Sequence, residues 1–142
     1  MRNDAKKKLV AAALEARTQA VAPYSKFKVG AALLTTGGEI ITGANVESAS
    51  YGLTCCAERV ALFKALTDGR KHFSAIAVVA ALTGGATPCG ACRQLLAEYA
   101  PLAIVWVADA RRPKQIKTFR VAQLLPRAFA LGQGLQKCPD RS

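Results

Sequence analysis

The order of apolar and polar residues along the chain predicts helices and strands in succession, beginning with a helix and a hairpin. Residues 4–20 carry apolar side chains at helical spacing, which indicates a helix, and Pro23 is expected to end it. Apolar runs over residues 27–34 and 40–43 flank a Gly-Gly turn, which is the pattern of a β-hairpin. The first third of the chain is therefore expected to form one helix followed by two antiparallel strands.

Helical and extended patterns continue to alternate through the rest of the chain. Helices are predicted over residues 55–67 (with Thr54 as N-cap) and 90–99, strands over 74–82, 103–107 and 116–120, and a last helical turn over 121–125. This alternation predicts a layered α/β domain, and the opening hairpin makes its sheet mixed. We expect one domain over residues 1–142, with residues 131–142 as a candidate disordered tail.

Composition narrows the class of protein. The chain has 142 residues, about half of them apolar, which suffices for one globular core. No apolar stretch approaches the ~20 residues of a membrane span, so we expect no membrane partner. The basic N-terminus resembles the start of a signal peptide, but Glu15 and Arg17 interrupt the apolar run that follows it. We therefore expect a cytoplasmic protein.

The net charge of +11 raises the question of nucleic-acid binding. The basic residues are scattered along the chain, and no aromatic residues alternate with them to stack on bases. A solvated basic surface is the favoured interpretation, and a nucleic-acid partner is disfavoured.

Five cysteines provide the first candidate chemistry. Cys56 and Cys89 each stand at the start of a predicted helix, where unpaired backbone N–H groups favour a thiolate. Cys89 and Cys92 lie three residues apart, so their sulfur atoms share one face of a helical turn and can share a metal. Three soft thiolates select zinc among the common metals, and we expect one Zn²⁺ per subunit.

A set of three cysteines leaves the fourth zinc position open for water, as in catalytic zinc sites. The remaining candidates for a fourth ligand, Cys55, Cys138 and His72, are poorly placed to fill it. Glu58 stands two residues after Cys56, where it can reach a zinc-bound water. We expect Glu58 to act as general base and general acid.

Arg59 follows Cys56 by three residues and shares its helix face. We expect Arg59 to donate hydrogen bonds to thiolate sulfur and so to restore the acidity of the bound water. A C-x-x-C pair alone is also typical of a redox pair or of half a zinc finger, and a non-catalytic zinc-binding module remains an alternative. Glu58 and the missing fourth ligand favour the catalytic interpretation.

These motifs resemble the signature of the cytidine deaminase family in its three-cysteine form. The similarity rests on Cys56-Ala57-Glu58 and on Pro88-Cys89-Gly90-Ala91-Cys92-Arg93-Gln94. It extends to residues 22–33, 45–49 and 124–129, so it covers most of the chain. The resemblance implies a three-layer α/β/α sandwich around a five-stranded mixed sheet, and a homotetramer with its sites near subunit interfaces.

The resemblance also implies roles for single residues. Phe27 would stack on the pyrimidine, and Asn45 and Glu47 would hydrogen-bond the ribose hydroxyls. Groups near Ala57 and Glu58 would bind the edge of the base.

Two further aromatic residues would act between subunits. By the resemblance, Phe129 reaches into the site of a neighbouring subunit, and Tyr51 contributes across an interface. Both roles depend on the implied homotetramer.

The activity implied by the resemblance is the zinc-dependent hydrolysis of cytidine and deoxycytidine to uridine and deoxyuridine plus ammonia, as in pyrimidine salvage. A polynucleotide-editing deaminase and a deaminase of a nucleoside-like antibiotic such as blasticidin S are alternatives with a similar metal motif. The expected ribose contacts of Asn45 and Glu47 favour a free nucleoside as substrate.

Overall fold

The computed structural model describes residues 2–131, which form four α-helices, five strands and one short 3₁₀ helix. The helices are α1 (Arg2–Arg17), α2 (Ala57–Thr67), α3 (Gly90–Tyr99) and α4 (Val121–Leu124). The strands are β1 (Val29–Thr35), β2 (Ile40–Ala44), β3 (Phe73–Ala80), β4 (Ile104–Asp109) and β5 (Arg112–Arg120), and the 3₁₀ helix η1 is Tyr51–Leu53. Within the described residues, no helix combines the length and apolar character that a membrane span requires.

The five strands form one mixed sheet in the order β2-β1-β3-β4-β5. β1 pairs antiparallel with β2 and β3, β3 pairs parallel with β4, and β4 pairs antiparallel with β5. The predicted hairpin is the β1–β2 pair, and its turn uses Gly38, whose φ of 94° lies in the region that glycine adopts most readily.

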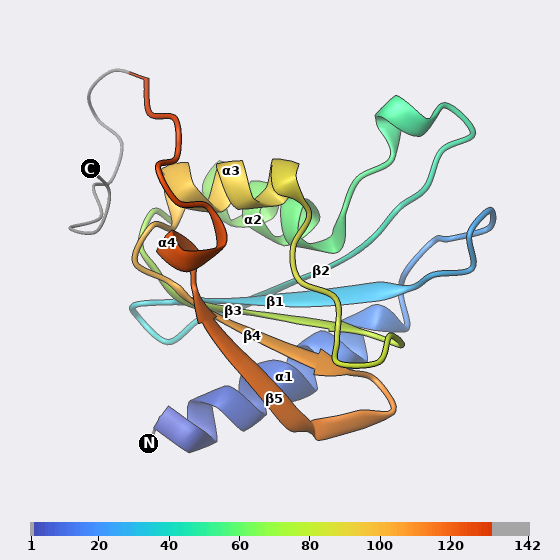
Figure 1. Ribbon diagram of the computed structural model, residues 1–142, viewed down its shortest axis with the longest axis horizontal. Coiled ribbons are helices and arrows are strands. Elements are labelled where there is room, and N and C mark those ends of the chain that lie inside the picture. Colours follow the sequence, from blue (N-terminus) through green and yellow to red (C-terminus); the bar gives the residue numbers. More distant parts are fainter. Residues whose placement is uncertain (1, 132–142) are drawn as a thin grey trace.

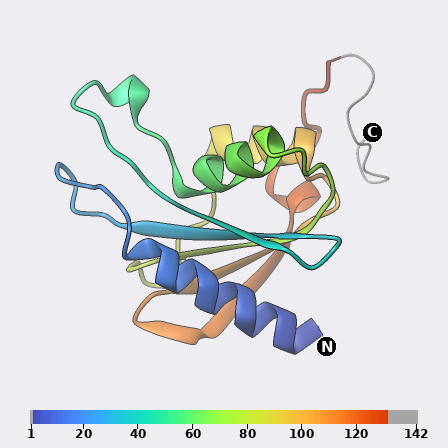
Figure 2. The same ribbon diagram turned by 180° about the vertical axis from the view of Figure 1, so that it is seen from behind.

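Helices cover both faces of this sheet and produce three layers (Figure 1). α1 crosses one face, and α2, α3 and α4 lie over the other, as the view from behind also shows (Figure 2). Along β4, Val105 and Val107 face the α2–α3 side while Trp106 and Ala108 face α1, because successive side chains of a strand alternate. The predicted α/β/α sandwich with a five-stranded mixed sheet is confirmed.

The end of α1 differs from the prediction. α1 ends at Arg17, well before Pro23. Residues 18–19 form a tight turn, and Val21 then pairs in extended conformation with Val46. This pairing, rather than the proline, draws the chain out of the helix.

The start of α2 also differs. Its N-cap is Cys56, so the predicted cap at Thr54 is wrong. Cys55 exchanges two backbone hydrogen bonds with Val46, at 2.8 and 3.0 Å, and this bridge keeps the chain extended up to Cys56. The helix therefore begins later than its apolar pattern suggested, and a metal-ligand candidate occupies its cap.

Gly43 allows α2 to lie directly against the backbone of β2. A Cβ atom at this position would lie 2.5 Å from the amide nitrogen of Ala61 and 2.6 Å from the carbonyl oxygen of Ala57, which is too close for any side chain. The first turns of α2 therefore rest on the sheet with no side chain between them. Because Cys56 and Glu58 stand at this end of α2, the close approach fixes their position relative to the sheet.

We expect Gly43→Ala to lower the free energy of unfolding by about 1–3 kcal/mol, the usual cost of overpacking a tight contact. The opposing atoms belong to the backbone of α2, so the helix must move to admit a methyl group. Urea denaturation measures the loss. Gly37→Ala in the same hairpin is the control, since its nearest neighbouring atom would be 3.8 Å away. Similar losses for the two substitutions would contradict this account of the packing.

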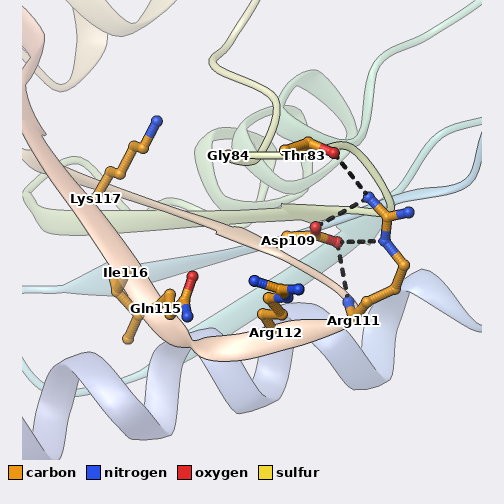
Figure 3. Close-up of a pocket in the computed structure, with 8 residues that line it drawn as sticks. All are labelled: Thr83, Gly84, Asp109, Arg111, Arg112, Gln115, Ile116 and Lys117. Atoms are coloured by element: carbon orange, nitrogen blue, oxygen red, sulfur yellow. Dashed lines mark hydrogen bonds and ion pairs between the residues drawn. The ribbon is translucent and has the colours of Figure 1, made fainter.

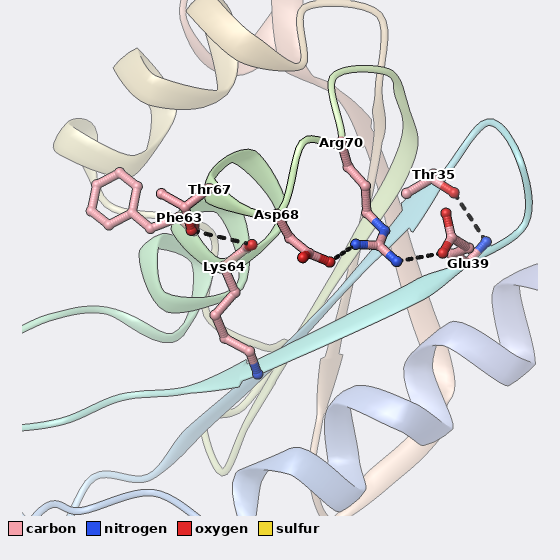
Figure 4. A network of polar contacts seen from close by, with 7 residues as sticks. All are labelled: Thr35, Glu39, Phe63, Lys64, Thr67, Asp68 and Arg70. Carbon is pink, nitrogen blue, oxygen red and sulfur yellow. Dashed lines mark hydrogen bonds and ion pairs between the residues drawn. The ribbon is translucent and has the colours of Figure 1, made fainter.

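The far end of α2 is tied to the β1–β2 turn by a polar network (Figure 4). The guanidinium group of Arg70 forms ion pairs with Asp68 and with Glu39. Lys64 Nζ donates a hydrogen bond to the carbonyl oxygen of Thr42 at 2.6 Å. Both acidic partners are largely exposed, so these pairs contribute little stability, but they lie at the end of α2 opposite the cysteines.

Candidate metal centre

Two helix starts on the same face of the sheet bring the predicted cysteines together. Cys56 is the N-cap of α2 and Cys89 is the N-cap of α3, and both have extended backbone. Cys92 follows in the first turn of α3 and is almost completely buried. The two helix starts thus place both capping cysteines at helix N-termini.

The spacing of the three sulfur atoms fits a zinc ion. They all lie within 4.8 Å of one another, and Cys56 Sγ and Cys89 Sγ are 3.7 Å apart. Tetrahedral zinc with Zn–S bonds of about 2.3 Å holds its sulfur ligands about 3.8 Å apart. Among residues 2–131, no other set of three histidine, cysteine or acidic side chains lies close enough together to hold an ion. The described residues therefore contain one group of side chains that fits a zinc ion.

Hydrogen bonds around Cys56 favour its thiolate form. The contact with Cys92 is the main reason why the pKa of Cys56 falls to about 5, while burial acts against the shift. The same contact, together with burial, raises the pKa of Cys92, so Cys92 holds the proton that the pair shares. Metal binding releases such a thiol proton, because zinc takes cysteine as thiolate.

Arg59 projects from the first turn of α2 back towards Cys56. Its Nη2 donates to Cys56 Sγ at 3.2 Å and to the carbonyl oxygen of Thr54 at 3.5 Å. The bond to Cys56 is the chief cause of a raised pKa of the guanidinium group. The predicted contact between Arg59 and a ligand sulfur is therefore present, and it holds a full positive charge beside the thiolates.

Replacing Arg59 by glutamine is expected to raise the Kd for zinc by about 10- to 100-fold, which is the usual effect of removing a group that hydrogen-bonds a metal ligand. The change removes the charge beside Cys56 and leaves all three sulfurs in place. Competition with a chromophoric zinc chelator measures the affinity. Arg70→Gln is the control, because Arg70 contacts Glu39 and Asp68 at the far end of α2. Equal zinc affinity in both variants would remove Arg59 from the metal centre.

Glu58 is a buried carboxyl group next to the sulfur atoms. It is the second residue of α2 and only 6% exposed. Burial raises its pKa to about 7, and the negative charge of Cys56 adds to this rise. A carboxyl group with a pKa near neutrality can both accept and release a proton at physiological pH.

A cavity of about 200 Å³ opens beside the cysteines. Its wall contains four of the residues predicted to bind or act on the substrate, namely Phe27, Asn45, Ala57 and Glu58. Other lining residues were not predicted, namely Val29, Thr54, Val78, Ala86 and Thr87. For two of these residues the sequence offered one indication: Thr54 and Thr87 each stand two residues before a candidate metal ligand.

Asn45 lines the cavity and also ties the start of β1 to the end of β2. Its Oδ1 accepts a hydrogen bond from the amide of Val29 at 2.8 Å, and its Nδ2 donates to the carbonyl oxygen of Phe27 at 2.8 Å. Each of these two atoms retains a second hydrogen-bonding position. The bonds fix the backbone of Phe27, whose side chain is 38% exposed at the cavity.

Glu47 lies in a neighbouring hollow of about 220 Å³, which Tyr51 also lines. The carboxylate accepts hydrogen bonds from the amides of Tyr24 and Ser25 at 3.1 Å and contacts the Ser25 hydroxyl. The hydroxyl contact is the main cause that lowers the pKa of Glu47. Thr54 lines both the hollow and the cavity, so Glu47 is adjacent to the cavity rather than part of its wall.

The two aromatic residues predicted to act between subunits are exposed in the single chain. Tyr51 is 82% exposed on η1, and Phe129 is 65% exposed beyond α4. The carbonyl oxygen of Phe129 accepts a hydrogen bond from Gln94 Nε2 at 3.1 Å, which attaches its backbone to α3. Neither side chain lines the cavity, so their roles remain predictions about an assembly.

Of the poorly placed candidate ligands, Cys55 and His72 lie within the described residues, and neither joins the sulfur group. Cys55 is half-buried, and it lines the cavity because its backbone pairing with Val46 keeps it outside the helix. Burial raises the pKa of its thiol. His72 is exposed. Cys138 and the predicted tail from residue 132 onwards lie outside the described residues.

Arg93 fixes the segment that leads into Cys89. Its Nε donates to the carbonyl oxygen of Pro88 at 2.7 Å and its Nη2 donates to Thr87 Oγ1 at 2.9 Å. Its Nη1 donates to the carbonyl oxygen of Leu124 in α4 at 3.0 Å. One guanidinium group therefore joins the cysteine-bearing segment to the last helix of the described chain.

Comparisons with known proteins agree with one another. The family model described as the cytidine and deoxycytidylate deaminase zinc-binding region matches residues 3–108. A cytidine deaminase of Halalkalibacterium halodurans is 52% identical over 85% of this chain and 91% of its own length. A cytidine deaminase of Sporosarcina psychrophila is 48% identical over 87% of this chain and 90% of its own length. The crystal structure of cytidine deaminase from Burkholderia pseudomallei is similar with a TM-score of 0.82 and 48% identity, covering 86% of this chain and 97% of that one.

Proposed function

We propose that this chain, because it belongs to the cytidine and deoxycytidylate deaminase family, hydrolyses the amino group of free cytidine and deoxycytidine. The products would be uridine or deoxyuridine and ammonia. One observation carries the proposal: a buried carboxyl group, Glu58, lies beside three cysteine sulfurs at a cavity. Neither a redox pair nor a structural zinc site would need such a carboxyl group.

Glu58 would move the protons of the reaction. Cys56, Cys89 and Cys92 would hold the zinc ion, which when bound supplies the Lewis acid that makes water nucleophilic near neutral pH. Glu58 accepts one proton of the attacking water and gives it to ring N3, which makes C4 electrophilic. It then takes the second proton of that water to the departing amino group, so that ammonia leaves and the carbonyl group forms.

The cavity wall supports a pyrimidine nucleoside as the ligand. Phe27 offers an aromatic face on which the base can stack, and the backbone near Ala57 lies beside Glu58 at the cavity. Asn45 keeps one donor and one acceptor position for a ribose hydroxyl. Glu47 stands in the adjoining hollow, where a sugar that extends past Thr54 would meet its carboxylate.

The active unit in this proposal is a cytoplasmic homotetramer that serves pyrimidine salvage. Tyr51 and Phe129 support an assembly because both are large, aromatic and more than half exposed. Such side chains are commonly buried between subunits. In the tetramer they would lie against a neighbouring chain, near its site.

The test is to incubate the zinc-loaded protein with cytidine and to follow the fall in ultraviolet absorbance together with ammonia release. We expect one ammonia per uridine formed, and loss of turnover when the metal is removed by a chelator. A parallel sample contains cytosine within single-stranded RNA instead of free cytidine. Turnover of the RNA alone would overturn the proposal in favour of an editing deaminase, and zinc-loaded protein without turnover of either would overturn it altogether.

A further inference from the structure

A second and larger cavity, of about 500 Å³, lies at the β4–β5 turn (Figure 3). It shares no lining residue with the cavity at the cysteines. Its wall comes from the β4–β5 hairpin and from the segment that follows β3. The charged side chains in this wall are three cations and one carboxylate, namely Arg111, Arg112, Lys117 and Asp109.

The carboxylate of Asp109 is already compensated within the hairpin. Asp109 is 7% exposed, and its two oxygens accept hydrogen bonds from the backbone amide, Nε and Nη2 of Arg111, each at 3.0 Å. These bonds, led by the side-chain pair, lower the pKa of Asp109. Asp109 therefore stays ionised and fixes Arg111 at the edge of the cavity. The positive charges of the other two cations, Arg112 and Lys117, are therefore not balanced by a second carboxylate in the cavity wall.

Arg112 and Lys117 supply this remaining charge. Figure 3 shows both side chains on β5, with Arg112 at its first residue and Lys117 further along the strand. Neither side chain forms an ion pair with an acidic residue in the part of the chain from residue 2 to 131. Arg112 also interacts electrostatically with Asp109, but Asp109 is the single carboxylate in the cavity wall, so the charged side chains of the cavity keep an excess of two positive charges.

The absence of a side chain at Gly84 leaves room for the ammonium group of Lys117. A Cβ atom at Gly84 would lie 2.9 Å from Lys117 Nζ, and the backbone of Gly84 has a φ of 79° that other residues rarely adopt. Neutral donors lie beside the two cations. Thr83 Oγ1 accepts a hydrogen bond from Arg111 Nη2 at 3.4 Å, which leaves its hydroxyl proton for a ligand, and Gln115 adds a side-chain amide.

We propose that this cavity binds a phosphate group, either as free phosphate or as the phosphate of a free nucleotide. The fork of an arginine matches two phosphate oxygens, and a lysine adds a point charge. The excess of two positive charges in the cavity wall matches the charge of a phosphate dianion. Binding here needs neither zinc nor a nucleoside in the other cavity, so it does not rest on the proposed deaminase function.

Isothermal titration calorimetry of the zinc-loaded protein at constant ionic strength tests the proposal. Inorganic phosphate and uridine monophosphate, which has no amino group to hydrolyse, are titrated separately. We expect saturable binding of one phosphate per chain. In the double variant Arg112→Gln/Lys117→Gln, Kd should rise about tenfold or more, because two charged hydrogen-bond donors are lost. Lys114→Gln is the control: it removes one charge from an exposed position on the same strand that does not line the cavity.

The two sources of phosphate are separated by their affinities. Equal Kd values, with competition between the two ligands, would show that the free anion is enough. A lower Kd for uridine monophosphate than for phosphate would identify a nucleotide as the ligand, provided that the double variant raises both Kd values by the same factor. Circular dichroism and the melting temperature of each variant show that the fold is retained.

Three results would overturn the proposal. The first is no saturable binding to the unmodified protein. The second is an equal loss in Lys114→Gln, which would indicate a general effect of the net charge of +11. The third is unchanged binding in the double variant, which would place the phosphate at the metal centre or in the nucleoside cavity. Because the readout is binding and not turnover, none of these results bears on the deaminase activity.

Discussion

Glu58→Gln is expected to reduce kcat for cytidine by about 10⁴-fold while the protein keeps its zinc. Glutamine has the shape of glutamate but cannot accept a proton from water or pass one to the base. Glu58 is also the single carboxyl group among the described residues that line the cavity at the cysteines, so no neighbour can replace it. The loss appears in steady-state rates measured by ultraviolet absorbance.

Two measurements make this result specific. Zinc content per chain should be the same in Glu58→Gln and in the unmodified protein, because Glu58 is not among the three sulfur ligands. Glu15→Gln makes the same chemical change at an exposed position of α1, on the opposite face of the sheet, and should leave kcat unchanged. A kcat for Glu58→Gln within tenfold of that of the unmodified protein would contradict the assignment of Glu58 as proton carrier.

Cys92→Ser is expected to remove nearly all bound zinc, to below about a tenth of an ion per chain after dialysis, and with it the activity. Serine is close to cysteine in size, so the nearly buried position is not emptied. Its hydroxyl group is a far poorer zinc ligand than a thiolate. Metal analysis by mass spectrometry after dialysis against a weak chelator measures the loss directly, without any need for turnover.

Cys55→Ser is the matched control for the metal analysis. Cys55 lies next to Cys56 in the sequence, yet its sulfur is not part of the three-sulfur group. We therefore expect Cys55→Ser to retain one zinc per chain. Full zinc content in Cys92→Ser, or equal loss in both variants, would contradict the ligand set that the sequence predicted.

Most of the candidate metal centre could be predicted from the sequence, because the spacing of its residues is set within single helical turns. Cys89 and Cys92 are fixed relative to each other by one helical turn, and Glu58 is fixed relative to Cys56 in the same way. One part of the prediction was long-range: the start of the helix with Cys56 had to lie beside the start of the helix with Cys89 and Cys92. The three-sulfur spacing of the structure supports that part.

The cavity wall could not be predicted from the residues alone, because it depends on contacts between distant segments. Phe27 is held by Asn45 across 18 positions of sequence, and no local pattern around Phe27 announces this bond. Val78 reaches the cavity from the interior of β3, where its apolar run indicates only a buried strand. The resemblance to a known family supplied the role of Phe27, which the hydrophobic pattern would have assigned to the core.

β5 illustrates a second limit of sequence reasoning. Its predicted start at residue 116 is late, and the strand begins at Arg112. The missed residues are mostly polar and exposed, so they carry no apolar signal. Arg112 pairs with Asp109 of the buried strand β4, and residues 113–115 lie at the register shift between this pair and the Ala108–Ile116 pair. The early start of the strand therefore depends on its neighbour and not on the residues themselves.

The bonds of Arg93 make α4 a structural support of the segment that leads into Cys89. A protein shortened before Leu124 would lose the acceptor for Arg93 Nη1, which lies 31 residues further along the chain. The guanidinium group would then be free to release Pro88 and Thr87, and Cys89 would lose its fixed approach to the metal. Because the same truncation removes Leu124, Leu125 and Ala128, which pack against the core, we expect zinc loss together with a lower melting temperature.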